Sequence, residues 1–295
     1  MKTIEISTLL KLHEVVTIPT LIHNCESWIL TATDLMKLER IEVWALKRML
    51  NLPEKTPTVA IRFVTGTLYT KIRIENKQMI YLQKLLQKDD DNWQKQILTT
   101  LDMESIGWAR KIRELLKEYH IEENWDKIRQ KTVNQWKLEV KLACEKRNRE
   151  IILSECEKRE GAEKSLKTKS RTIHEIVNNG QYEREPIKCI VSLDKLKAKA
   201  IVMARYGMLD CGTNYRMKYG QTKCKECKME DDEQHRINDC TKYRDINNCD
   251  NPVKFHFGGV YANDRDTVNQ SAEGILKIWD LENGKNVIRS EGTQM

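Results

Sequence analysis

The sequence predicts an all-α fold on three grounds. Charged residues make up 32% of the 295 residues and aromatic residues only 6%. Glycine and proline are scarce, with 12 and 5 copies. Apolar residues recur at steps of three or four in several stretches, which is the period of a helix with one buried face. Together these features are typical of helices with long solvated faces rather than of a β-sandwich or a doubly wound sheet.

The clearest helix is predicted to begin after Thr33. The hydroxyl of Thr33 is suited to cap the first turn, where the charge of Asp34 is also favourable. Asn51 and Pro53 are expected to end the helix. Further amphipathic helices are predicted at 74–87, near 93–101 and at 108–119. The apolar stripe of the first helix consists of Leu35, Leu38, Ile41, Ala45 and Met49.

The tryptophans of the N-terminal half lie within helical patterns. For such residues core packing is a commoner role than stacking on nucleic acid bases, so we expect them to be buried. They are Trp28, Trp44, Trp93, Trp108, Trp125 and Trp136.

A long charged helix is predicted from Glu122 to about Ser170, followed by shorter elements. Its apolar residues are sparse and irregularly spaced, so we expect an exposed helix and find little support for a sustained coiled coil. The polar block 157–171 lacks a buried face and is the predicted linker. Beyond it, helices are expected at 193–206 and 268–281. We therefore predict four parts, which are a helical region at 1–120, the charged helix and linker at 121–171, a basic helix with a metal module at 172–250, and a C-terminal tail at 251–295.

The metal module is predicted from four soft ligands at close spacing. They are Cys224, Cys227, His235 and Cys240, in the pattern Cys-x2-Cys-x7-His-x4-Cys. Tetrahedral zinc takes thiolate sulfur and imidazole nitrogen, and a structural site uses four protein ligands and leaves no open position. The sequence therefore predicts a structural zinc ion. The alternative is a ligand set that no longer binds metal.

Cysteine use and hydropathy indicate an intracellular, reducing environment. The count of nine cysteines is odd, and three of them fall in this one window. We find neither a secretory signal near Met1 nor an apolar run long enough to span a membrane, so no membrane partner is expected. In a reducing compartment such spacing favours metal over disulfide. The nucleus and the cytoplasm are equally compatible with these features.

The net charge of +7 is concentrated just before the metal ligands. Residues 188–223 carry eight basic side chains against two acidic ones, whereas the ligand window 224–240 carries three basic against six acidic. Lys and Arg bind phosphate by displacing condensed counterions, so we expect the basic segment rather than the zinc module to contact RNA or single-stranded nucleic acid. The alternative is a solvated helix face. The expected contacts are Lys195, Lys197, Lys199, Arg205, Arg216, Lys218 and Lys223.

Two segments resemble the reverse transcriptases of LINE-type (non-LTR) retrotransposons. The first, 18–52, is similar to the region after the polymerase palm, where His23 and Asn24 stand in place of the family's Tyr and Gly. The second, 198–240, is similar to the family's C-terminal zinc-binding region. Together they cover about a third of the chain. The first match runs through Leu21, Cys25, Glu26, Trp28, Leu30, Leu38 and Arg48.

The resemblance implies an RNA-directed DNA polymerase in the intact parent, but this chain lacks the residues for that reaction. Polymerases hold two metal ions with aspartates, which the family keeps in a Tyr-x-Asp-Asp turn. No such tetrad occurs here, and the stretch before Ile18 is too short for fingers and palm. We therefore expect no catalytic centre and no enzyme activity. The sequence leaves three alternatives, which are a nucleic acid binding remnant, a protein-interaction scaffold that docks a partner through 122–170, and a fragment without selected function.

Overall fold

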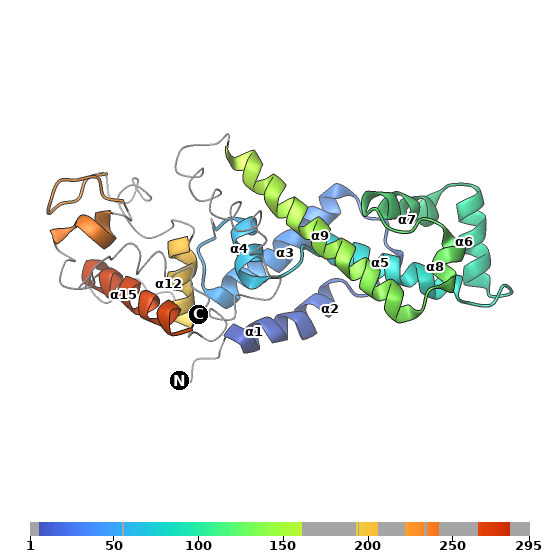
Figure 1. The fold of residues 1–295 in the computed structure, drawn as a ribbon, viewed down its shortest axis with the longest axis horizontal. Coiled ribbons are helices and arrows are strands. Elements are labelled where there is room, and N and C mark those ends of the chain that lie inside the picture. The colour runs from blue at the N-terminus through green and yellow to red at the C-terminus, as the bar shows by residue number, and fades with distance from the viewer. Residues whose placement is uncertain are drawn as a thin grey trace. The chain divides into compact units, whose positions relative to one another are not determined.

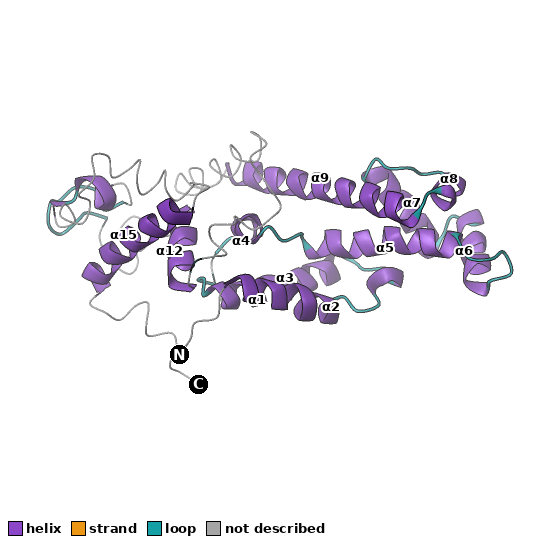
Figure 2. Ribbon diagram, turned by 60° about the horizontal axis from the view of Figure 1, so that its bottom comes forward, coloured by secondary structure: helices purple, strands orange, loops and turns teal. Residues whose placement is uncertain are grey.

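The computed structural model describes residues 6–54, 56–160, 193, 195–205, 222–232, 235–241 and 265–283. Over these ranges the chain is helical, and the single strand pairing found there is an isolated antiparallel bridge between Lys223 and Glu230 (Figures 1 and 2). The predicted all-α fold class is confirmed. None of the helices in this part of the chain is both long enough and apolar enough to cross a membrane.

The chain divides into two compact units. Unit 1 comprises Met1–Lys11, Lys47–Gly66 and Cys156–Met295, and unit 2 comprises Leu12–Leu46 and Thr67–Glu155. Unit 2 holds most of the described helices. Unit 1 holds the four predicted metal ligands.

Unit 2 is built around helix α5 (Thr70–Leu86), which is buried along much of its length. Around it lie the single turns η1 (His13–Thr17), α2 (Ile18–Leu21) and η2 (Cys25–Ser27) and most of α3 (Ala32–Leu50). The remaining helices are α6 (Trp93–Met103), α7 (Gly107–Glu118), α8 (Trp125–Gln130) and α9 (Val133–Glu160, whose last five residues fall in unit 1). Helix α5 packs against η2, α6, α7 and α8. Figure 2 shows α9 running alongside α5.

Helix α3 begins two residues earlier than predicted, because Thr31 rather than Thr33 provides the cap. The backbone N–H of Asp34 donates to Thr31 Oγ1 at 3.2 Å, and the Thr31 hydroxyl donates back to Asp34 Oδ2 at 2.7 Å. The end is as predicted, since Asn51 follows Leu50 with a φ of 53°. The buried face of α3 differs from the predicted apolar stripe. Leu35, Leu38, Ala45 and Met49 are only half-buried and Ile41 is 52% exposed, whereas the buried residues are Glu42, Val43, Leu46 and Leu50.

The predicted helix from Glu122 onward is two helices, and its second part is not simply exposed. The chain breaks after α8, and Thr132 starts α9 by accepting from the N–H of Gln135 at 3.2 Å while Gln135 Oε1 accepts from the N–H of Thr132 at 3.0 Å. Such a reciprocal cap is the capping box. One face of α9 is buried at four-residue steps, by Trp136, Val140, Cys144, Asn148 and Ile152. Residues 161–170 lie outside the described residues.

The tryptophans divide into buried and exposed groups. Trp136 is fully buried and its Nε1 donates to the carbonyl of Met79 at 2.9 Å, and Trp108 is 9% exposed and donates to the carbonyl of Glu26 at the same distance. Trp44 and Trp93 are 57% and 64% exposed. The prediction of core packing is therefore wrong for Trp44 and Trp93, because helical spacing alone does not say which face meets a neighbour.

The segment 18–38 contributes to the core of unit 2. Cys25 is completely buried with Ile18, Ile22 and Ile74, and Leu21, Trp28, Leu30, Leu35 and Leu38 pack against this cluster. Gln78 Nε2 donates to the carbonyls of Cys25 and Trp28, at 3.3 and 2.7 Å. Asn24 holds the turn with a φ of 54°, a left-handed conformation that glycine adopts freely and asparagine tolerates.

Unit 1 contains the other described elements. They are α1 (Ile6–Leu12, whose last residue falls in unit 2), α4 (Thr58–Thr65), α12 (Lys195–Arg205), the turn η3 (His235–Asp239) and α15 (Arg265–Asn283). Helices α12 and α15 match the predictions at 193–206 and 268–281, whereas α4 was not predicted. The two helices pack against each other, with Ala198, Ile201, Ala272 and Ile275 buried.

Candidate metal centre

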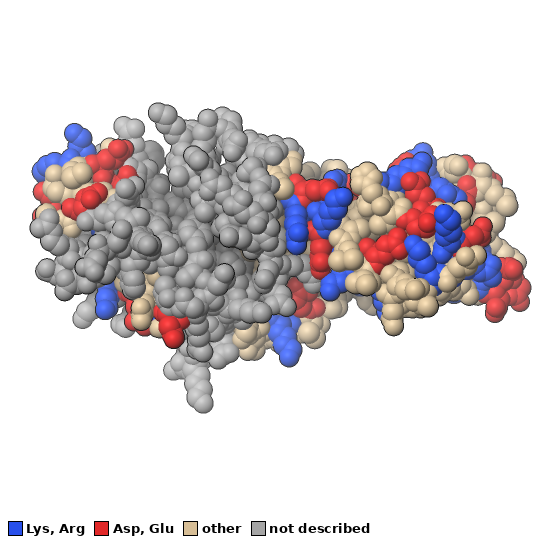
Figure 3. Space-filling view, viewed as in Figure 1, with Lys and Arg blue, Asp and Glu red and all other residues tan. Residues whose placement is uncertain are grey.

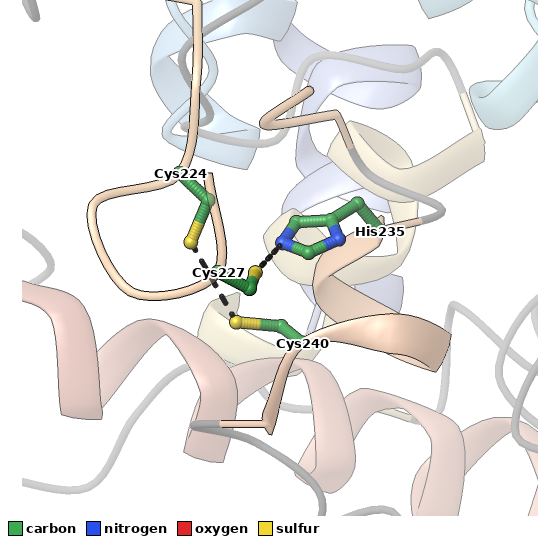
Figure 4. A group of neighbouring side chains, drawn as sticks. All are labelled: Cys224, Cys227, His235 and Cys240. Atoms are coloured by element: carbon green, nitrogen blue, oxygen red, sulfur yellow. Dashed lines mark hydrogen bonds between the residues drawn. The ribbon is translucent and has the colours of Figure 1, made fainter. Parts of the chain in front are cut away.

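The four predicted ligands come together in one cluster (Figure 4). Their donor atoms all lie within 4.8 Å of one another. Cys224 Sγ and Cys240 Sγ are 3.8 Å apart, and Cys227 Sγ is 3.0 Å from His235 Nε2. Cys240 and His235 are buried, and Cys224 and Cys227 are half-buried. The arrangement could therefore hold a metal ion.

A short hairpin positions the first two ligands. The N–H of Cys224 donates to the carbonyl of Met229 at 2.8 Å, and the N–H of Lys228 donates back to the carbonyl of Cys224 at 3.1 Å. A further bond, from the N–H of Asp231 to the carbonyl of Thr222 at 2.7 Å, closes the base. The turn requires Lys228 to adopt a φ of 62°, which is unfavourable for a residue with a Cβ.

The turn η3 positions the other two ligands. The side chain of Asp232 accepts from the N–H of His235 at 2.7 Å and thereby caps the turn. The N–H of Cys240 donates to the carbonyl of His235 at 2.8 Å, so the turn closes over five residues. This wide turn brings the His235 ring and the Cys240 thiol to the same cluster.

An ion pair joins the hairpin to η3. Arg236 Nε and Nη2 each lie 2.6 Å from one of the carboxylate oxygens of Asp231. Both side chains are nearly buried, at 7% and 11% exposure. A two-pronged pair of this kind fixes relative orientation as well as position. Asp231, Asp232 and Arg236 thus support the ligands, and no spacing rule distinguished them from the other charged residues of the window.

The electrostatics of the site favour thiolate at Cys224. Burial raises the pKa of this thiol, but hydrogen bonds from the backbone N–H groups of Cys227 and Glu226 and from the side chains of His235 and Cys227 outweigh burial and lower it to about 7. Thiolate is the form that binds metal.

The donor set and its spacing fit zinc. Tetrahedral zinc with Zn–S bonds of about 2.3 Å separates two sulfurs by about 3.8 Å, the distance between Cys224 and Cys240. The contact between Cys227 and His235 has the length of a hydrogen bond and would lengthen to about 3.5 Å around zinc. The other ring nitrogen of His235, Nδ1, is buried and has no hydrogen-bond partner among the described residues. Zinc-bound histidines usually donate this second N–H, and the described residues provide no acceptor for it.

The seven expected nucleic acid contacts are only partly described. Lys197 is half-buried on α12, and its Nζ lies 2.7 Å from Glu273 Oε1 and 2.8 Å from Asn269 Oδ1 of α15. Lys199 is half-buried and Lys223 is exposed beside Cys224. For Lys195 and Arg205 only the helical backbone is described, and Arg216 and Lys218 lie outside the described residues.

Comparison with known proteins identifies no relative. No protein-family model, no curated protein and no solved structure matches this chain.

Proposed function

We propose that this chain is a non-catalytic remnant of a LINE-type reverse transcriptase that binds RNA or single-stranded nucleic acid through 188–223, next to a structural zinc ion. The observation that carries the proposal is the four-ligand cluster. Four protein donors leave no position for water or substrate, so the ion would act in folding rather than in catalysis. The proposal also rests on the sequence resemblance and on the charge surplus of 188–223.

Zinc is the first part of the proposal to test. Native mass spectrometry of reduced, purified protein is expected to show one zinc ion per chain, and Cys227→Ser and His235→Ala are expected to lose it. Cys144→Ala, which changes a buried thiol of unit 2, serves as the matched control and should keep the ion. A reduced wild type without zinc would mean that the cluster no longer binds metal.

Nucleic acid binding is tested by salt and by charge reversal. An interface with about six phosphate contacts loses affinity steeply as salt rises. Reversal of Lys195, Lys197 and Lys199 to glutamate is expected to abolish retention of a single-stranded RNA. Because Lys197 pairs with Glu273, the control for a packing defect is the swap Lys197→Glu with Glu273→Lys, which keeps an ion pair between α12 and α15. Undiminished RNA retention after the triple reversal would refute the binding proposal.

A second candidate function is a scaffold that binds a protein partner through α9. The observation in its favour is the outer face of this helix, where Leu138 and Leu142 lie one turn apart and are 56% and 57% exposed. Exposed apolar pairs on a helix can anchor a partner helix. Replacing both leucines by glutamine would then abolish partner binding and leave RNA retention unchanged, whereas the opposite pattern would favour nucleic acid binding.

A further inference from the structure

The solvent-facing side of α6 in unit 2 is uncharged. Trp93, Gln96, Ile97, Thr100 and Met103 recur at steps of three or four and therefore share one face. All five are exposed, with Trp93 at 64%, Ile97 at 50% and Met103 at 80%. The face runs for roughly 15 Å along the helix. In a chain with 32% charged residues, an exposed face with large apolar side chains and no charge is a candidate binding surface.

The opposite side of α6 explains why these residues are not buried within unit 2. Leu98 is 3% exposed and points into the unit, where α6 packs against α5 and α7. The charged residues of the helix also lie away from the outer face, since Lys95 pairs with Asp90 at 2.5 Å and Asp102 pairs with Arg113 at 2.5 Å. The packing of unit 2 therefore does not require the outer face of α6 to be buried.

Acidic side chains flank this face at both ends. Asp89 and Asp91 precede α6, Glu104 follows it, and all three are exposed. Among the described residues none of the three has a cation within ion-pair distance, in contrast to Asp90, which Lys95 and Arg129 approach. In Figure 3 the acidic atoms gather where the loop before α6 projects. Negative charge therefore borders the apolar face at its beginning and at its end.

We propose that this outer face of α6 binds a helix of a partner protein that carries an apolar stripe with basic residues at both ends. The apolar side chains would supply the buried area, as in other complexes where an amphipathic helix lies against an apolar surface. The acidic ends would select orientation and partner, because complementary charge at the rim of an interface governs specificity and association rate.

The same charges argue against other occupants. In a two-fold symmetric pair the same patch meets itself, so packing α6 on a second copy of this chain would bring Asp89 and Asp91 against acidic residues in either orientation. Phosphate groups of a nucleic acid or of an anionic lipid would be repelled for the same reason. The proposal does not depend on the zinc ion or on nucleic acid binding.

The test uses the full chain and two synthetic helical peptides with the same leucine stripe, one with lysines at both ends and one with glutamates. Fluorescence anisotropy at moderate salt is expected to show at least about tenfold tighter binding of the lysine peptide. The triple variant Asp89→Lys, Asp91→Lys, Glu104→Lys should reverse the preference. Ile97→Ser should weaken binding of the lysine peptide by about tenfold. Trp44→Ser, which changes an exposed tryptophan on another helix of unit 2, is the matched control and should have no effect.

Each contrary outcome overturns the proposal. Equal binding of both peptides, absence of binding, or unchanged preference in the triple-lysine variant would show that the acidic ends do not select a basic helix. Concentration-dependent dimerisation in sedimentation experiments that Trp93→Ser abolishes would assign the face to a second copy. Association with uncharged phosphatidylcholine vesicles that Trp93→Ser abolishes would assign it to a lipid surface.

Discussion

Unit 2 and the hairpin 222–231 of unit 1, which carries Cys224 and Cys227, are each stabilised by different physical means. The core of unit 2 is apolar and extends over residues that are distant in sequence, such as Ile22, Ile72, Met79 and Ile112, all with at most 1% exposure. Burial of such side chains contributes about 1.5 to 3 kcal/mol each. Among the side chains whose burial is described in the hairpin and η3, in contrast, Cys240 is the only buried apolar one. Its described contacts are the hydrogen bonds and the ion pair around the four clustered residues, so we expect its order to depend on metal binding.

The comparison indicates how a small segment can become ordered without an apolar core. Where few apolar side chains are available, metal binding can supply the folding free energy directly. The supporting contacts of the hairpin are polar and local, such as the pair between Asp231 and Arg236. Unit 2 also has buried hydrogen bonds in addition to its apolar core, but these join residues that are distant in sequence. The side chain of Gln78, for example, donates to the carbonyl of Trp28. The two regions should therefore respond to different perturbations.

The largest expected difference follows from removing a ligand. His235→Ala or chelation should unfold the segment 222–241, because structural zinc contributes on the order of 10 kcal/mol to such modules. Hydrogen exchange followed by mass spectrometry should show fast exchange at 222–241 and unchanged protection in α5 and α7. Loss of protection in α5 as well would mean that the two regions fold as one.

Removing a core side chain should have the converse effect. Trp136→Ala deletes a fully buried indole and its bond to the carbonyl of Met79, so we expect unit 2 to lose about 3 to 5 kcal/mol. Urea unfolding monitored by circular dichroism measures the loss. Zinc content should stay at the wild-type value, and a lower zinc content would contradict the independence of the two regions. Trp93→Ala, at an exposed site, is the control and should cost far less.

Breaking the ion pair of the hairpin tests its polar support. Arg236→Ala removes the cation that pairs with the nearly buried carboxylate of Asp231, which we expect to cost about 3 kcal/mol of local stability. Competition with a fluorescent chelator would report this as weaker zinc affinity. The double variant Asp231→Leu, Arg236→Met should recover most of the affinity, because it leaves no unpaired charge. An equal loss of zinc affinity in the single and the double variant would show that the charged pair of Asp231 and Arg236 is itself needed to orient the ligands.

A pH experiment tests the polar support of unit 2. Burial raises the pKa of Glu75 above its ordinary 4.5, against the opposing effects of Lys71 and of the Tyr119 hydroxyl, which donates at 2.6 Å. From pH 4.5 up to the raised pKa the folded state holds more protons than the unfolded state, so the free energy of unfolding falls as pH rises. Glu75→Gln keeps an acceptor for the Tyr119 hydroxyl and removes the titrating carboxyl group. The free energy of unfolding of the variant relative to that of the wild type should therefore increase over this pH interval. Urea unfolding of both proteins at each pH measures this difference, and a difference that stays constant across the interval would contradict a buried, titrating Glu75.

The smallest effects are expected at the left-handed residues. Lys228→Gly should strengthen zinc binding by about 1 kcal/mol, because glycine adopts the φ of 62° without strain. Asn24→Gly in unit 2 should change stability by only a few tenths of a kcal/mol, since asparagine already tolerates this conformation. Lys225→Gly, in the same hairpin but without a positive φ, is the control and should weaken zinc binding slightly. A gain at position 225 equal to that at 228 would rule out backbone strain as the cause.

Part of the fold was predictable because its signals are local. Helices α3, α5, α6, α7, α12 and α15 follow apolar periodicity, although their ends were displaced by up to four residues, as at Thr70. The helix cap at Thr31 was missed because two threonines lie near the start and only the hydrogen bonds with Asp34 distinguish them. The buried face of α9 was missed because Asn148 interrupts its apolar pattern, and the amide of Asn148 accepts from the N–H of Tyr69 at 3.4 Å.

The sequence by itself determined the helical class and the four residues that lie together in the candidate metal centre. Both follow from spacing along the chain, since a helix repeats every 3.6 residues and a Cys-x2-Cys pair places two sulfurs on one turn. Only the tertiary structure decided that Trp136 is buried while Trp93 is exposed, that Arg236 supports the metal ligands through Asp231, and that Lys197 pairs with Glu273. Burial and ion pairing depend on which segments, distant in sequence, come into contact, and the local spacing of residues does not specify those contacts.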